Sequence, residues 1–156
     1  VEFLISYFGE NKMNKLKHIY QNELGWTTFI KYFQYLNNNK EKFSLSLFEF
    51  AREAGRYELR GEKTLHDAWL TDLHISKIYN GDLLTTNIEI TLLHADHEKE
   101  IILKYFNVTH FNSLLNTNHG FRQPADLLVH EVQYLEPFKF KHSMEFAWDV
   151  WIDITF

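Results

Sequence analysis

The chain has 156 residues, a formal net charge of −5 and a pI near 6.0. This length predicts a single domain over residues 1–156. The negative charge argues against a nucleic-acid partner, because binding a phosphate backbone needs clustered Lys and Arg. The absence of cysteine excludes disulfides, thiol nucleophiles and Cys-based zinc sites.

The sequence carries no export or membrane signal. Residues 1–8 lack the basic region and cleavage site of a signal peptide, and no run of about 18 apolar residues is present. We therefore expect a cytoplasmic protein with no membrane partner. Lys outnumbers Arg and Asn is abundant, which favours a bacterial source. The sequence leaves open whether the native start is residue 1 or Met13.

Residues 13–55 are predicted to be helical. Apolar residues recur at helical spacing over residues 13–24 and again over residues 26–36. A third helix over residues 47–54 has a capping box from Ser46 to Glu49, and Gly55 follows it as a stop. Tyr32 and Tyr35 lie off the apolar stripe of the second helix. Partial burial is the more common arrangement for such residues, and an exposed interface formed by the pair is the alternative.

From residue 64 onward the apolar residues mostly alternate, as in strands. A first long strand begins near Thr64 and ends at Asn80-Gly81, which favours a type I′ hairpin turn. The next strand carries its apolar residues on one face: Ile88, Ile90 and Leu92. A third strand near residues 101–111 is apolar on both faces, which is typical of a central strand. Residues 112–125 are predicted to form a loop.

The C-terminal part of the chain predicts three more strands. One spans about residues 126–135 and ends at Glu136-Pro137. Residues 138–156 alternate over a length of about 60 Å, too long for one strand, so we expect two strands divided near Trp148 and Asp149. The predicted fold is α+β, with two or three N-terminal helices over residues 13–55. A curved antiparallel sheet or partial barrel of five or six strands follows over residues 64–156.

The candidate chemistry depends on histidines and carboxylates in the strands. The candidate catalytic residues are His66, Asp67, His130, Glu131 and His142, and the candidate metal ligands are the three histidines among them. A metal site needs three or four such groups around one ion. The alternation of strand faces argues against convergence, because each carboxylate should point away from the histidine before it. No cofactor is predicted.

A structural role is the alternative for the pair His66 and Asp67, which would fix the transition from helix to sheet. The segment His94-Ala95-Asp96-His97 resembles part of the signature of metallo-β-lactamase-like hydrolases. Leu92 stands where the first histidine of that signature should be, and the segment falls in a predicted hairpin. We therefore assign no site there.

One block of the chain resembles known sequences. Leu65-His66-Asp67-Ala68-Trp69-Leu70, with residues 48–51, 57–59 and 126–132, resembles a family of small uncharacterised bacterial proteins over residues 43–156. The resemblance implies a bacterial α+β domain and no activity.

Three functions remain as expectations. The leading one is a non-enzymatic protein-binding domain of immunity or accessory type, whose acidic, aromatic-rich surface recognises another protein. The alternative is a metal-dependent hydrolase that uses the strand histidines and carboxylates. The third is a small-ligand carrier with an aromatic pocket. A homodimer through a sheet edge, or through Tyr32 and Tyr35, is compatible with the sequence.

Overall fold

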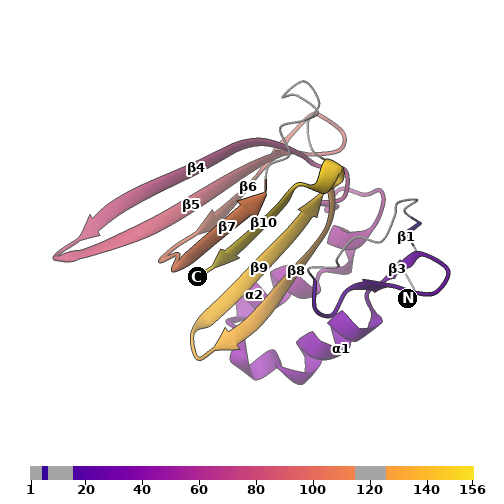
Figure 1. Ribbon diagram of the computed structural model, residues 1–156, viewed down its shortest axis with the longest axis horizontal. Helices are drawn as coiled ribbons and strands as arrows, with labels where there is room; N and C mark the ends of the chain where they lie inside the picture. The colour runs from indigo at the N-terminus through magenta and orange to yellow at the C-terminus, as the bar shows by residue number, and fades with distance from the viewer. Residues whose placement is uncertain (1–4, 7–15, 115–125) are drawn as a thin grey trace.

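The computed structural model describes residues 5–6, 16–114 and 126–156 (Figure 1). Within these ranges the fold is α+β, with helices α1 (Ile30–Asn38) and α2 (Leu45–Arg52) and with antiparallel strands in three sheets. The sheets do not close into a barrel. None of the described helices has the length and apolar character needed to cross a membrane.

Two sheets make up most of the fold. The larger one has the strand order β7 (His110–Leu114), β10 (Trp151–Thr155), β9 (Lys139–Phe146) and β8 (Leu127–Glu136). The second has the order β4 (Trp69–Asn80), β5 (Leu83–Leu93) and β6 (Glu100–Tyr105). A single bridge between Trp69 and Asp126 joins the start of β4 to the start of β8. A small third sheet contains β1 (Ile5–Ser6), β3 (Trp26–Thr28) and β2 (Tyr20–Gln21).

The hairpin of β4 and β5 extends far beyond the rest of the molecule (Figure 1). We call its outer part, residues 75–86, the arm. The predicted hairpin is confirmed. In its two-residue loop, Gly81–Asp82, the first residue has a positive φ of 64°, which fits a type II′ turn rather than the predicted type I′. Exposed apolar residues are concentrated on the arm: Ile75, Ile78, Tyr79, Leu83 and Leu84.

Two apolar clusters form the core of the described chain. The first lies between the two larger sheets and includes Ile88, Ile90 and Leu92, so their predicted inward face is confirmed. The second lies where both helices pack on β8, and it includes Leu36 of α1 and Phe48 of α2. Burying side chains of this size stabilises a fold by about 1.5–3 kcal/mol each, which explains why the helices stay on β8.

The predicted division of the C-terminal alternation is confirmed. β9 and β10 are separated by the short 3-10 turn Ala147–Asp149, where Trp148 and Asp149 both have φ near 60°. The third predicted strand is not central, because β6 is an edge strand of its sheet and exposes Ile102. β7 occupies residues 110–114, part of the predicted loop, and residues 115–125 lie outside the described chain.

Helices α1 and α2 begin at other residues than the sequence predicts. α1 begins at Ile30 rather than near Trp26, because residues 26–28 pair with β1 and β2 as strand β3. α2 begins at Leu45, and its N-cap is Ser44 instead of Ser46. The Ser44 hydroxyl accepts a hydrogen bond from the Leu47 N–H at 3.3 Å. The predicted capping box of Ser46 and Glu49 is therefore wrong, and a single hydrogen bond to Ser44 caps the helix two residues earlier.

The predicted helix over residues 13–24 is wrong for its described part. Residues 16–24 contain the short strand β2 and a turn. The backbone N–H groups of Lys17, His18 and Ile19 all donate to the carboxylate of Glu131, so these donors are used by a distant side chain and no helix forms there.

Tyr32 and Tyr35 are buried or half-buried, so the alternative of an exposed patch is contradicted and burial, the more common arrangement, is observed. Tyr32 is fully buried, and its hydroxyl accepts a hydrogen bond from the Val132 N–H at 2.9 Å. The hydroxyl of Tyr35, which is half-buried, accepts one from the Tyr134 N–H at 2.6 Å. These N–H groups lie on the outer edge of β8, the end strand of its sheet. Helix α1 therefore closes this edge with two side-chain hydroxyls.

We predict that Tyr32→Phe lowers the free energy of unfolding by about 1–3 kcal/mol, because it leaves the buried Val132 N–H without a partner. Urea unfolding followed by circular dichroism measures this loss. The matched control Tyr79→Phe removes an exposed hydroxyl from the arm and should change stability by less than about 0.5 kcal/mol. Equal stabilities of the two variants would contradict this role of Tyr32.

Candidate functional site

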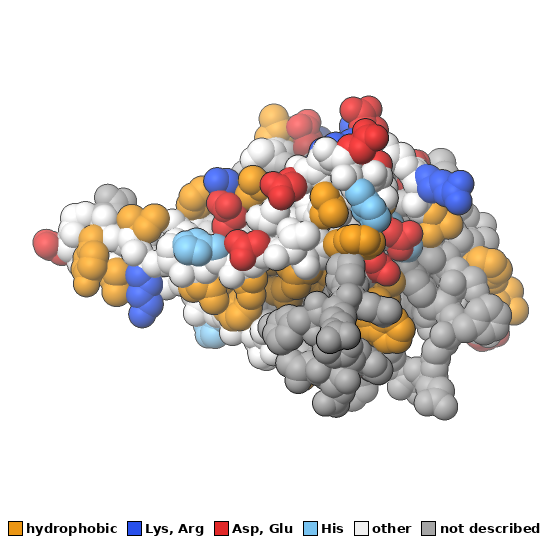
Figure 2. Space-filling model, turned by 90° about the horizontal axis from the view of Figure 1, so that it is seen from above, with side chains coloured by type: hydrophobic (Ala, Val, Ile, Leu, Met, Phe, Trp, Pro, Cys, Tyr) orange, Lys and Arg blue, Asp and Glu red, His pale blue; other side chains and the backbone are white. Residues whose placement is uncertain are grey.

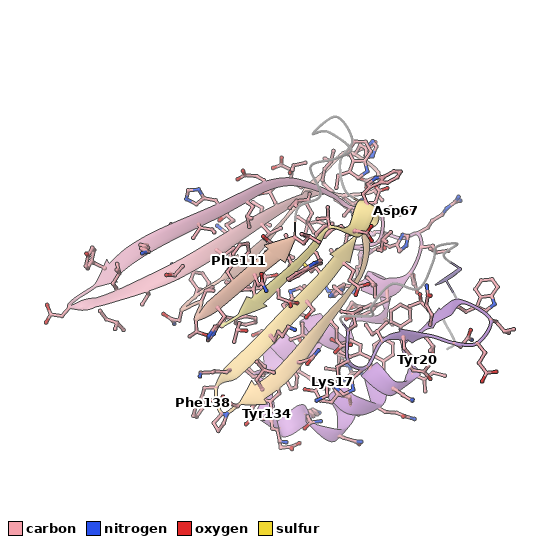
Figure 3. The ribbon with its side chains drawn as sticks, viewed as in Figure 1. Lys17, Tyr20, Asp67, Phe111, Tyr134 and Phe138 are labelled. Atoms are coloured by element: carbon pink, nitrogen blue, oxygen red, sulfur yellow. The ribbon has the colours of Figure 1, made fainter. Side chains whose placement is uncertain are left out.

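The five candidate catalytic residues do not share one site. His130 and His142 lie together in the core between β8 and β9. Glu131 belongs to the opposite face of β8, and His66 with Asp67 forms a turn before β4. Figure 3 shows Asp67 at the end of the β8–β9 pair opposite to Phe138. Each group therefore has to be considered separately.

The two core histidines form a hydrogen-bonded chain with a tyrosine. His130 Nδ1 lies 3.1 Å from His142 Nε2, and His142 Nδ1 lies 2.7 Å from the hydroxyl of Tyr105. All three side chains are buried, and the ring of Tyr57 stacks on His130 at 4.6 Å. The other ring nitrogen of His130 has no hydrogen-bond partner among the described residues. The hydrogen bonds that join His130, His142 and Tyr105 therefore lie inside the core, away from solvent.

Burial keeps both histidines neutral. It lowers the pKa of His142 to about 3, with a smaller effect from the charge of Arg56. It also lowers the pKa of His130 well below its usual value, helped by His142 and Arg56. Burial raises the pKa of Tyr105, so this hydroxyl remains protonated. At neutral pH the three groups are therefore uncharged and offer no positive charge to an anion.

Glu131 has a structural partner for each of its oxygens. Oε2 accepts from the backbone N–H groups of His18 at 2.8 Å and Ile19 at 2.9 Å. Oε1 accepts from the Lys17 N–H at 3.2 Å and from the Gln133 amide at 2.6 Å. Burial raises the pKa of this carboxyl, and the donors act in the opposite direction. Glu131 thus fixes residues 17–19 on β8 and does not face the histidines.

The pair of His66 and Asp67 lies in the turn between the helical part of the chain and β4. His66 Nδ1 lies 2.9 Å from Asp67 Oδ1, although neighbouring strand residues would point to opposite faces. They meet because residues 64–68 form a turn and Asp67 has a φ of 60°. The Asp67 N–H also donates to the carbonyl of Leu127 at 2.9 Å. These contacts join the turn to β8, and the structural role suggested for the pair by the sequence stays a prediction.

A polar pocket of about 520 Å³ lies beside this turn. Its wall includes Asp67 and Trp69 and, from the turn after β5, His94, Asp96 and His97. His94 Nδ1 lies 2.9 Å from Asp96 Oδ1, and the ring of His97 lies 4.0 Å from that of Trp69. His94 is buried and also accepts the Asp96 N–H at 3.2 Å, so its ring shapes the turn. The predicted hairpin position of this motif is confirmed.

The described residues contain no group of three His, Asp or Glu side chains that could hold a metal ion. The histidines that the sequence suggests as ligands instead contact one nearby aspartate, as in the polar pocket, or one another, as in the core. Buried imidazoles with such partners are ordinary structural elements.

A second pocket, of about 510 Å³, lies at the opposite end of the β8–β9 pair (Figure 3). We call it the phenylalanine pocket. Its apolar wall consists of Leu47, Phe50, Phe106, Phe138, Phe140 and Phe156. Its polar atoms come from Ser44, Ser46 and Asn107. The pocket is shallow and wide open to solvent, with a mostly aromatic lining, so it is a candidate contact surface rather than an enclosed ligand cavity.

Phe138 is the most unusual residue of this pocket. It occupies the two-residue turn between β8 and β9, where it is 94% exposed and has a φ of 64°. Glycine or asparagine is favoured at a positive φ, and a bulky residue costs about 1 kcal/mol there. Phe106, on the other side of the pocket, is 60% exposed. Neither Phe106 nor Phe138 was predicted as a binding residue from the sequence, although Pro137-Phe138 places a large apolar side chain next to a predicted turn.

Comparisons with known proteins add no assignment. No family model, no curated protein and no solved structure matches this chain. The resemblance of residues 65–70 to a bacterial family therefore stays a prediction, and functional conclusions depend on the geometry alone.

The buried histidines predict a loss of stability in mild acid. The folded pKa of His142 is about 3 and its unfolded value is 6.5, so the unfolded chain binds more protons between these values. The stabilisation is complete above pH 6.5 and decreases as the pH falls toward 3. From pH 7 to pH 5 His142 lowers the free energy of unfolding by about 2 kcal/mol, and His130 acts in the same direction.

Urea unfolding at both pH values measures this dependence. His142→Phe should remove the part of this loss that His142 causes, about 2 kcal/mol. His110→Ala, at an exposed position of β7, should retain all of it. A wild-type chain with the same stability at pH 7 and pH 5 would contradict the prediction.

Proposed function

We propose that this chain is a non-enzymatic protein-binding domain and that the phenylalanine pocket receives an apolar side chain of its partner. The observation that carries the proposal is Phe138, a large apolar residue held almost fully exposed at a strained backbone position. A strained residue that does not stabilise the fold favours a functional role. Exposed aromatic residues around a pocket are also typical of binding hot spots.

The arrangement of the apolar surface supports a protein partner. Phe138 projects from the turn between β8 and β9, and Phe106 from the end of β6, so the rim of the pocket has exposed apolar groups on two sides. A partner that covers both residues would bury an apolar centre, with Ser44, Ser46 and Asn107 as hydrogen-bonding groups. The immunity or accessory role expected from the sequence is one form of this function.

The small-ligand carrier is a second candidate because it would use the same pocket, whose volume lies in the range of roughly 300–1,000 Å³ found for small-molecule sites. The two candidates differ in their bound species. Native mass spectrometry of the purified chain should show only bare protein if a protein is the ligand. A constant small-molecule adduct, lost on removal of the Phe138 ring, would favour the carrier.

We predict that Phe138→Gly separates binding from stability. Glycine relieves the positive φ, so the free energy of unfolding should stay equal or rise by up to about 1 kcal/mol. The fluorescence of an anilinonaphthalene sulfonate probe in the pocket should decrease, since the variant loses part of the apolar rim. The control Leu24→Ser removes another exposed apolar side chain, from the turn before β3, and should leave probe fluorescence unchanged.

Affinity capture with the same variants tests the partner. A cellular protein retained by the wild type and by Leu24→Ser should be lost from Phe138→Gly. Its binding should slow amide exchange in residues 104–108 and 138–140. Capture of the same protein by Phe138→Gly, or unchanged exchange in these residues, would argue against the phenylalanine pocket as the site.

A further inference from the structure

β4 is a long strand with a free edge. It is 12 residues long and pairs with β5 on one side. On its other side the described residues provide only the bridge from Trp69 to Asp126, at the start of the strand. A bulge between Leu70 and Asp72 separates this start from residues 72–80. A free edge of this length is about 30 Å of unpaired backbone.

The free edge of β4 differs from the edge of β8. Along β8, the hydroxyls of Tyr32 and Tyr35 accept hydrogen bonds from the backbone N–H groups of Val132 and Tyr134. Residues 72–80 of β4 contain no proline, and Asp72 and Lys77 are their only Asp, Glu, Lys or Arg residues. Figure 2 shows the arm standing out from the body, with hydrophobic side chains gathered toward its end. A partner strand can therefore approach it without obstruction from the described part of the chain.

Side chains on both faces of β4 favour pairing. Leu73, Ile75 and Tyr79 lie on the face that continues the core, because they are opposite Ile90, Ile88 and Leu84 of β5. Ile78 lies on the other face, and it is about half exposed like Ile75. A new strand beside β4 would cover these groups as well as satisfy the backbone. Apolar edges of this kind are sites of strand addition.

We propose that β4 pairs antiparallel with β4 of a second copy of this chain, about a twofold axis at Ser76. Residues directly opposite each other in antiparallel strands point to the same side of the sheet. If the twofold axis is normal to the sheet, the core-facing side chains of both copies therefore share one side only when some residue lies opposite the same residue of the second copy. Ser76 is the midpoint of residues 72–80, so this register pairs the whole free stretch. It joins the two three-stranded sheets into one continuous sheet.

The charges of β4 fit this register. Leu73 lies opposite Tyr79 of the second copy, and Lys77 opposite Ile75. Asp72 lies opposite residue 80, so no charged residue is directly opposite a like charge. The two Lys77 residues are diagonal neighbours, and their long side chains can diverge into solvent. Registers centred on Asp72 or Lys77 would place like charges face to face, which destabilises a pair of strands.

The pairing is independent of the phenylalanine pocket, and light scattering of the wild-type chain tests it first. The mass in solution at micromolar concentration should be twice the chain mass of 18.8 kDa. Ile75→Lys places a lysine opposite Lys77 of the second copy and should halve the mass. Adding Lys77→Glu to that variant places opposite charges face to face and should restore the dimer.

Cysteine cross-linking tests the register, because the chain has no native cysteine. Two residues that pair with each other across antiparallel strands are close enough for a disulfide. Ser76→Cys should therefore form a linked dimer under mild oxidation about tenfold faster than Asn87→Cys. Asn87 is the matched control, since it lies opposite Ser76 in the same hairpin but one strand further from the axis.

The proposal is overturned by a monomeric wild-type chain, by a dimer that Ile75→Lys does not weaken, or by equal cross-linking of the two cysteine variants. The cross-linking result does not depend on the folding of the lysine variant. Circular dichroism of Ile75→Lys checks its folding, which should be native because Ile75 is half exposed.

Discussion

The edge of β8 is the constraint on which the helical part of this fold depends. An end strand exposes backbone N–H groups, and here Tyr32 and Tyr35 of α1 accept two of them while Glu131 binds the backbone of residues 17–19. These contacts place α1 and the N-terminal segment on the sheet. The second apolar cluster, which also holds α2, forms around the same contacts. The helices are therefore tied to the sheet by polar bonds as well as by apolar burial.

Local sequence signals predicted the parts of the fold that depend on local chemistry. The alternation over residues 138–156 gave β9 and β10 with their division at Trp148, and Asn80-Gly81 marked the long hairpin. The helix over residues 13–24 failed because Glu131, more than 100 residues away, binds its backbone. The partner of the Tyr32 hydroxyl was unpredictable for the same kind of reason, since it lies on β8. Long-range side-chain to backbone bonds leave no periodic signal in a sequence.

The candidate site was predictable only in part. His130 and His142 were both expected on apolar faces, and they meet because His142 pairs with Val132, two residues from His130 on the same face. That register cannot be read from the two segments separately. Asp67 was expected to point away from His66, but its positive φ reverses this. The residues of the phenylalanine pocket come from five separate elements of the chain, so no single stretch of sequence predicts the pocket.

The bond between Glu131 and residues 17–19 has a consequence for the order of events during synthesis. Residues 17–19 and helix α1 leave the ribosome roughly 100 residues before β8, which at about 5–20 residues per second is a delay of about 5–20 s. During that interval Tyr32 and Tyr35 have no strand to bind. Residues 17–19 and α1 therefore cannot reach their places on the sheet until β8 has been synthesised, although they precede it in the chain.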